Sequence, residues 1–161
     1  MSATARAAAK PLSESEVVLT RVFDAPRALV FEIWTEPHHL AKWWGPRDFT
    51  NPVCELDVRV GGKILIHMRA PDGTVYPMTG TFREIVAPER LVFTAIVEDR
   101  NGRALLEGVV TVTFEEEGGK TRLTVREKAV ALQPVAGPML AGMEAGWAQS
   151  LYRLETVVPK S

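Results

Sequence analysis

Hydrophobic and polar residues alternate over most of the chain between residues 53 and 130, which is the two-residue period of β-strands. The pattern predicts six strands there, over residues 53–58, 63–69, 78–85, 91–97, 105–115 and 121–130. A seventh strand, rich in β-branched residues, is predicted before them over residues 17–24. Short segments containing Gly, Pro, Asn and Asp separate the six later strands. Connections this short predict an antiparallel meander, because parallel strands need long crossovers.

The rest of the hydrophobic pattern is typical of helices. Two short helices are predicted after the first strand, one ending near Thr35 and the next running through Trp43 to stop at Gly45. A long final helix is predicted over residues 135–158, where hydrophobic residues recur at intervals of three and four. This stripe consists of Leu140, Met143, Trp147, Leu151, Leu154 and Val158.

Together these elements predict an α+β fold in which a curved seven-stranded antiparallel sheet wraps around the long C-terminal helix. One face of such a sheet must be covered, and the single hydrophobic stripe of the final helix suits that role. The two short helices are expected to close one end. We expect residues 1–15, rich in Ala and Ser, to form a flexible tail and residues 16–161 to form one domain.

Composition narrows the classes of function. Hydrophobic residues make up 46% of the chain and charged residues 24%, and the formal net charge is -1. Such a balance argues against a nucleic-acid partner, which requires a basic excess on one face. No apolar run reaches the ~18 residues that span a bilayer, so no membrane partner is expected. A single cysteine, Cys54, and a first segment without the apolar core of a secretory signal predict a soluble, cytoplasmic protein.

Several short motifs occur in the order in which a known family carries them. They are Arg21–Pro26, Trp34–Pro37, Trp43–Pro46, Asp57–Gly62, Pro71–Gly73, Pro88–Leu91, Gly119–Leu123 and Gly146–Trp147. In these motifs the chain resembles the START-like superfamily, also called the helix-grip or SRPBCC fold, over residues 17–158. Within that superfamily it is most similar to the family named for the activator of the ninety-kilodalton heat-shock chaperone ATPase.

The resemblance implies a cavity between sheet and helix, because the fold typically encloses one. The family includes small-molecule carriers and proteins that sequester reactive natural products, and related branches include polyketide cyclases. Its eukaryotic chaperone activators carry an additional amino-terminal domain, for which this chain has only a short segment. The fold itself does not decide between these functions.

Strand alternation and the helical stripe indicate which side chains face such a cavity. The predicted ligand-binding residues are Trp34, Trp44, His67, Met68, Phe82, Phe93, Val110, Val112, Glu127, Met143, Trp147 and Leu151. Aromatic and aliphatic walls of this kind suit a small apolar ligand. The alternative is that these residues fill a solid core, since protein interiors pack densely.

Glu127 is the most informative polar residue, because alternation places its carboxylate on an apolar face. There it needs a partner or a raised pKa, and it could anchor a ligand hydroxyl or amine or act as a general base. The alternative is that a bulge turns it to solvent or that an arginine neutralises it. The direction of His67 stays open, because both faces of its strand are mixed.

No other motif indicates catalysis or a bound metal. The adjacent His38 and His39 do not share a helix face, and no Cys, His and carboxylate cluster has zinc-ligand spacing, so neither a metal nor a cofactor is predicted. Asp57 and Arg59, two apart on a strand, are expected to form a structural salt bridge.

Three functions therefore compete. The first is binding or sequestration of a small hydrophobic or aromatic molecule, with a cavity-filling change such as Gly108→Leu expected to abolish binding. The second is an enzyme of the polyketide cyclase type with Glu127 as the candidate base. The third is a chaperone-linked interaction module that uses an exposed patch around Trp43 and Trp44. Dimerisation through an edge strand is left open.

Overall fold

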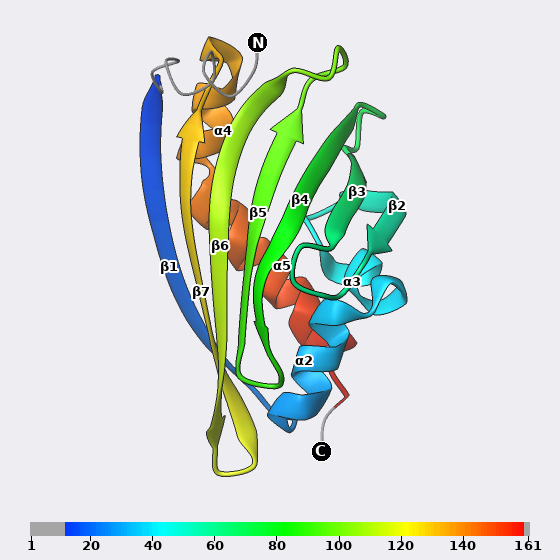
Figure 1. Ribbon diagram of the computed structural model, residues 1–161, viewed down its shortest axis with the longest axis vertical. Coiled ribbons are helices and arrows are strands. Elements are labelled where there is room, and N and C mark those ends of the chain that lie inside the picture. The colour runs from blue at the N-terminus through cyan, green and yellow to red at the C-terminus, as the bar shows by residue number, and fades with distance from the viewer. Residues whose placement is uncertain (1–11, 160–161) are drawn as a thin grey trace.

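The computed structural model describes residues 12–159 (Figure 1). Its strands are β1 (Ser13–Phe23), β2 (Thr50–Leu56), β3 (Lys63–Arg69), β4 (Val75–Val86), β5 (Arg90–Glu98), β6 (Ala104–Glu117) and β7 (Lys120–Ala131). Its helices are α2 (Arg27–Thr35), α3 (Pro37–Trp43), the short 3₁₀ turn η1 (Pro134–Ala136), α4 (Gly137–Ala141) and α5 (Met143–Val157). All seven predicted strands and the two predicted short helices are present, with ends that differ by a few residues.

The strands form one antiparallel sheet in the order β1-β7-β6-β5-β4-β3-β2. Strands β2 to β7 follow the predicted meander, while β1 pairs with β7, so that β1 and β2 are the two edges. Figure 1 shows this sheet curving around α5, with α2 and α3 gathered at one end. The α+β helix-grip architecture expected from the order of elements is therefore confirmed.

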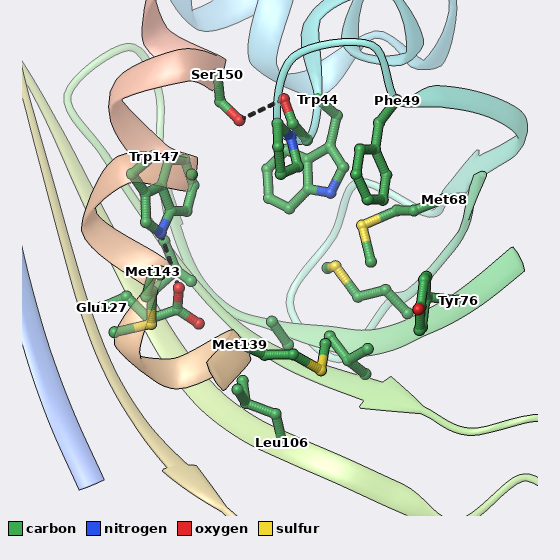
Figure 2. A pocket seen from close by; sticks show the side chains of 18 of the residues that line it. Trp44, Phe49, Met68, Tyr76, Leu106, Glu127, Met139, Met143, Trp147 and Ser150 are labelled. Carbon is green, nitrogen blue, oxygen red and sulfur yellow. Dashed lines mark hydrogen bonds between the residues drawn. The ribbon is translucent and has the colours of Figure 1, made fainter. Parts of the chain in front are cut away.

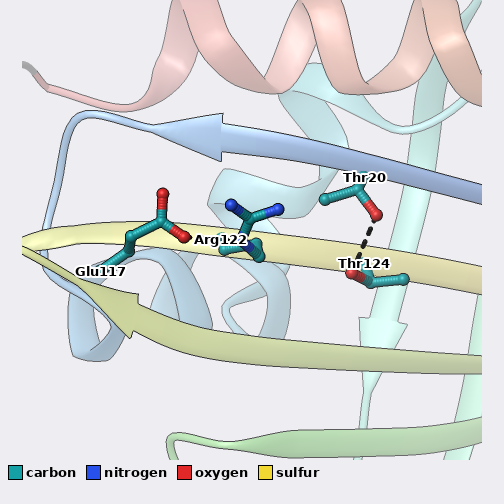
Figure 3. Close-up of polar contacts among 4 residues, drawn as sticks. All are labelled: Thr20, Glu117, Arg122 and Thr124. Atoms are coloured by element: carbon teal, nitrogen blue, oxygen red, sulfur yellow. Dashed lines mark hydrogen bonds and ion pairs between the residues drawn. The ribbon is translucent and has the colours of Figure 1, made fainter.

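The two faces of the sheet differ as the alternation predicts. On β7, Leu123 and Val125 point inward and are fully buried. The residues that alternate with them, Arg122 and Thr124, point outward and make polar contacts across the strands (Figure 3). The hydroxyl oxygens of Thr20 and Thr124 lie 3.1 Å apart, and Nε of Arg122 donates a 2.6 Å hydrogen bond to Glu117. The concave face is thus the only one that needs a cover.

The C-terminal segment covers that face, but it is not the single helix that the hydrophobic spacing predicts. It consists of η1, the short α4 and the long α5, and Gly142 separates the two α-helices. All six residues of the predicted stripe are nevertheless buried. Pro134, Pro138 and Gly142 are the residue types least compatible with a helix interior, and hydrophobic spacing does not register them.

The start of the domain also differs from the prediction. Strand β1 begins at Ser13, so residues 13–15 of the expected tail are paired with β7. Residues 1–11 of that tail lie outside the described residues. The predicted Asp57–Arg59 salt bridge is confirmed, with 2.8 Å between Nε of Arg59 and Oδ2 of Asp57. None of the helices within residues 12–159 is long and apolar enough to cross a membrane.

Candidate ligand-binding cavity

A cavity of about 360 Å³ lies between the concave face of the sheet and the C-terminal helices, and it opens to solvent (Figure 2). Strands β3 to β7, the segment after α3, and helices α4 and α5 contribute to its wall. It is lined by Trp44, Gly45, Pro46, Phe49, Met68, Tyr76, Met78, Ala95, Val97, Leu106, Val110, Glu127, Pro138, Met139, Gly142, Met143, Gly146, Trp147 and Ser150.

The wall is apolar and unusually rich in methionine. Four of the five methionines in the chain line the cavity, namely Met68, Met78, Met139 and Met143. Methionine side chains are unbranched and polarisable, so they adapt to irregular shapes and make favourable contacts with aromatic rings. The cavity can therefore adjust its walls to ligands of somewhat different outline.

All four tryptophans of the chain gather beside the cavity. The indole of Trp147 stacks on that of Trp34 at 6.1 Å between ring centroids, and it meets Trp44 edge-on at 5.5 Å. Trp34 also meets Trp43 edge-on at 4.6 Å. Packed aromatic groups such as these fix one another's orientation.

The rim formed by residues 44–49 is held in place by α5. Nη1 of Arg153 donates hydrogen bonds to the carbonyl oxygens of Trp44, Gly45 and Pro46, at 2.9 to 3.1 Å. The hydroxyl of Ser150 donates a further 2.8 Å bond to the Gly45 carbonyl (Figure 2). Burial lowers the pKa of the Arg153 guanidinium, although nearby Asp48 opposes this change. Gly45 has φ +93°, a conformation that favours glycine, which lets the chain turn into the rim.

Glu127 is the polar centre of the cavity. Its side chain comes from the inner face of β7, is 7% exposed, and accepts a 2.8 Å hydrogen bond from Nε1 of Trp147 (Figure 2). Burial raises the pKa of this carboxyl group, and the indole hydrogen bond partly offsets that rise. The burial of Glu127 agrees with the apolar-face position that alternation predicts, and no bulge turns it to solvent. Its partner is an indole rather than an arginine.

Gly108 makes room for this carboxyl group. It faces Ala129 across the β6–β7 pair, next to Glu127. A Cβ atom at position 108 would overlap Oε2 of Glu127 and lie 3.2 Å from Cβ of Ala129. A side chain at this position would displace the carboxyl group, so Gly108→Leu is not the simple cavity-filling change that the strand pattern predicts.

The structure brings six of the twelve predicted ligand-binding residues to the cavity wall. These are Trp44, Met68, Val110, Glu127, Met143 and Trp147. Trp34, Phe82 and Phe93 line an adjoining hollow of about 10 Å³, which shares Trp44 and Met78 with the cavity. Val112 and Leu151 are buried in the core, 0% and 1% exposed, and line neither space.

His67 lies on the other side of the sheet. Its neighbour Ile66 is 1% exposed and its other neighbour Met68 lines the cavity, so alternation along β3 directs His67 to the outer face. The sequence does not predict the direction of His67, because both faces of this strand mix apolar and polar residues. The register between β3 and its neighbours determines it.

The exposed tryptophan patch considered from the sequence does not exist. Trp43 is 0% exposed and Trp44 is 7% exposed, because both pack into the aromatic cluster. Within residues 12–159, no group of three or more His, Cys, Asp or Glu side chains is placed to hold a metal ion.

Sequence reasoning missed the rim residues Pro46 and Phe49, the lining residues Tyr76 and Met139, and the role of Arg153. The position of Met139 could have been predicted, because it lies four residues before Met143 and would share its face of a helix. The other residues come from a loop, a strand end and the polar side of a helix, and no periodicity marks them as cavity residues.

Comparison with solved structures finds the same fold in several bacterial proteins. An uncharacterised protein from Rhizobium leguminosarum is 26% identical, with a TM-score of 0.77 over 90% of this chain and 94% of that chain. A protein from Arthrobacter aurescens is 27% identical, with a TM-score of 0.76 over 92% of this chain and 91% of that chain. The AHSA1 protein of Silicibacter pomeroyi is 24% identical and matches with a TM-score of 0.74, over 88% and 96% of the two chains.

A search of curated proteins found no match to this chain. The family model described as activator of Hsp90 ATPase homolog 1-like protein matches residues 24–159, which is most of the chain. That match begins at the end of β1 and ends after α5, so it includes the complete cavity wall. The START-like resemblance of the sequence motifs is thereby confirmed, and the chain belongs to the activator of Hsp90 ATPase homolog 1-like family.

Proposed function

We propose that this protein binds a small, largely apolar or aromatic molecule in its cavity and acts as a carrier or sequestering protein. The observation that carries the proposal is the open cavity of about 360 Å³ with an apolar, methionine-rich and tryptophan-rich wall. Its volume is within the range of small-molecule sites, roughly 300–1,000 Å³. We further propose that it acts in the cytoplasm, where the single free cysteine, Cys54, stays reduced.

For a small ligand, the apolar wall alone supports only weak affinity. Burying a ligand with roughly ten carbon atoms contributes about 8 kcal/mol, at about 0.8 kcal/mol for each CH₂-sized group. Lost translation and rotation cost at least about 4 kcal/mol on association. What remains is at most about 4 kcal/mol, a dissociation constant no tighter than about 1 mM, so a ligand of this size that binds more tightly must also use the polar centre at Glu127.

Gly146→Leu tests the proposal with little risk to the fold. Gly146 lies on α5 and lines the cavity, and a Cβ atom there would meet Cγ of Pro46 at an ordinary 3.8 Å. Leucine is also a better helix former than glycine, by about 0.8 kcal/mol. The variant should therefore place its side chain in the cavity and remain folded. The matched control is Ala145→Leu, one residue earlier on an exposed part of α5.

The measurement is binding of the neutral fluorescent probe N-phenyl-1-naphthylamine. The wild-type protein and Ala145→Leu should bind the probe alike, and Gly146→Leu should bind it at least about tenfold more weakly. Equal binding by all three proteins, or no binding by any of them, would refute the proposal. Native mass spectrometry of the purified protein adds a search for a retained natural ligand.

An enzymatic function is the alternative that a specific observation favours. A buried carboxyl with a raised pKa, such as that of Glu127, is typical of a general base. However, the hydroxyl of Ser150 is bonded to the rim, and among the lining residues within 12–159 no second side chain is of a type that ordinarily titrates near neutral pH. A binding function needs no such second group, and we therefore prefer it.

A further inference from the structure

Among the described residues that line the cavity, Glu127 is the one with a carboxyl group, and none is basic. Its two cross-strand neighbours on the inner face are Val17 of β1 and Val110 of β6, which are 5% and 0% exposed. The α5 side chains nearest to it along the wall are those of Met143 and Trp147. The carboxyl group is therefore surrounded by uncharged side chains.

The basic residues near Glu127 in sequence or space point elsewhere. Arg126 and Lys128 flank it on β7 but are exposed on the outer face, where Arg126 bonds to Glu16 at 2.8 Å. Arg153 points its guanidinium at the carbonyl groups of the rim. No cation of the described residues 12–159 pairs with this carboxyl in the cavity.

The geometry leaves one oxygen of the carboxyl group available. Oε1 accepts the hydrogen bond from Trp147, and Oε2 occupies the space that the absent side chain of Gly108 leaves at the cavity wall. We propose, resting on the proposed function, that the natural ligand is an apolar molecule with one basic amine, whose ammonium group binds Oε2 of Glu127.

Electrostatics favour this class of ligand over its neutral and acidic analogues. A buried carboxylate without a counter-charge is costly, and an ammonium group supplies that charge. Hydrogen bonds between charged partners are roughly twice as strong as those between neutral ones. Indole rings attract cations, and two of them, Trp44 and Trp147, line the same wall. A ligand with a carboxylate, such as a fatty acid, would instead meet a like charge or a buried acid.

The proton balance is simple in either protonation state. An ammonium ligand binds directly to an ionised Glu127. Where the carboxyl group is protonated in the free protein, a neutral amine accepts that proton on binding, and the same ion pair forms. In the second case one O–H bond breaks and one N–H bond forms, and no bond between heavy atoms changes in either case.

Three probes of nearly equal size separate these possibilities, namely 2-(1-naphthyl)ethylamine, 2-(1-naphthyl)ethanol and 1-naphthaleneacetate. Isothermal titration calorimetry at pH 7.5 should show the amine binding about tenfold more tightly than the alcohol, and the acetate most weakly. In Glu127→Gln, which keeps the size of the side chain and an oxygen that accepts from Trp147, the amine should fall to the affinity of the alcohol. Circular dichroism checks that the variant is folded.

The outcomes distinguish this inference from the proposed function. If the alcohol binds wild-type protein as tightly as the amine, or if the preference for the amine survives in Glu127→Gln, the inference is wrong but the cavity still binds apolar molecules. If N-phenyl-1-naphthylamine binds but none of the three probes displaces it, the inference fails and the proposed function stands. If neither the dye nor any of the three probes binds, both proposals fail together.

Discussion

Replacing Trp147 by phenylalanine should destabilise the protein more than the same change at Trp34. Both indoles are buried, 7% and 3% exposed, and they stack on each other in one cluster. The nitrogen of Trp147 donates to Glu127, whereas Nε1 of Trp34 is buried with no hydrogen-bond partner. Each variant loses a similar volume of ring, so the difference between them combines the lost hydrogen bond to the carboxyl group with the removal of the unpaired N–H group of Trp34.

The magnitude follows from the state of that carboxyl group. A hydrogen bond to a neutral group contributes about 1 kcal/mol and one to a charged group up to about 3 kcal/mol. Trp147→Phe should therefore cost about 1–3 kcal/mol more than Trp34→Phe. The difference should grow as the pH rises, because the bond stabilises the ionised form of Glu127 more than the protonated one.

Urea unfolding followed by far-UV circular dichroism at pH 5 and pH 8 measures this difference without relying on tryptophan fluorescence. The slopes of the unfolding free energy against urea should match among the variants, so that the free energies can be compared. Equal costs for the two substitutions at both pH values, or a larger cost at Trp34, would show that the bond to Glu127 does not stabilise the fold.

Three further predictions concern Glu127, Arg153 and Cys54. Burial raises the pKa of Glu127 above its ordinary value of 4.5, so between these two values the folded state binds more protons than the unfolded state. The protein therefore loses stability as the pH rises from 4.5 through the pKa of the folded state. Glu127→Gln should lack this loss, so its melting temperature should rise relative to that of the wild type between pH 4.5 and 8. If the difference between the two melting temperatures stays constant over this range, the buried carboxyl of Glu127 does not cause the loss. Arg153→Lys cannot reproduce the bonds to three rim carbonyl groups, and it should cost about 2 kcal/mol in urea unfolding. An unchanged midpoint would show that the rim does not depend on them. Burial, aided by Glu55, raises the pKa of the Cys54 thiol to about 11, so roughly one thiol in a thousand is ionised at pH 8. Iodoacetamide should therefore modify the native protein far more slowly than the urea-unfolded one, and equal rates would refute this.

The sequence by itself determined the elements and their buried faces. Strand alternation identified the inward side chains of β7, including Glu127, and the spacing of the C-terminal stripe identified six residues that are all buried. These predictions succeed because burial of a face imposes a local period on the residues that share it. Short turns likewise made the antiparallel meander predictable.

Only the tertiary structure decided what each inward residue meets. The outward direction of His67 and the core position of Leu151 depend on how β3 and α5 pack against their neighbours. Glu127 and Trp147 lie twenty residues apart, and Arg153 reaches a rim more than a hundred residues away. A periodic pattern reports which face is buried, but it carries no information on the partner across the interior, because that partner is set by the curvature of the sheet and the path of the helix over it.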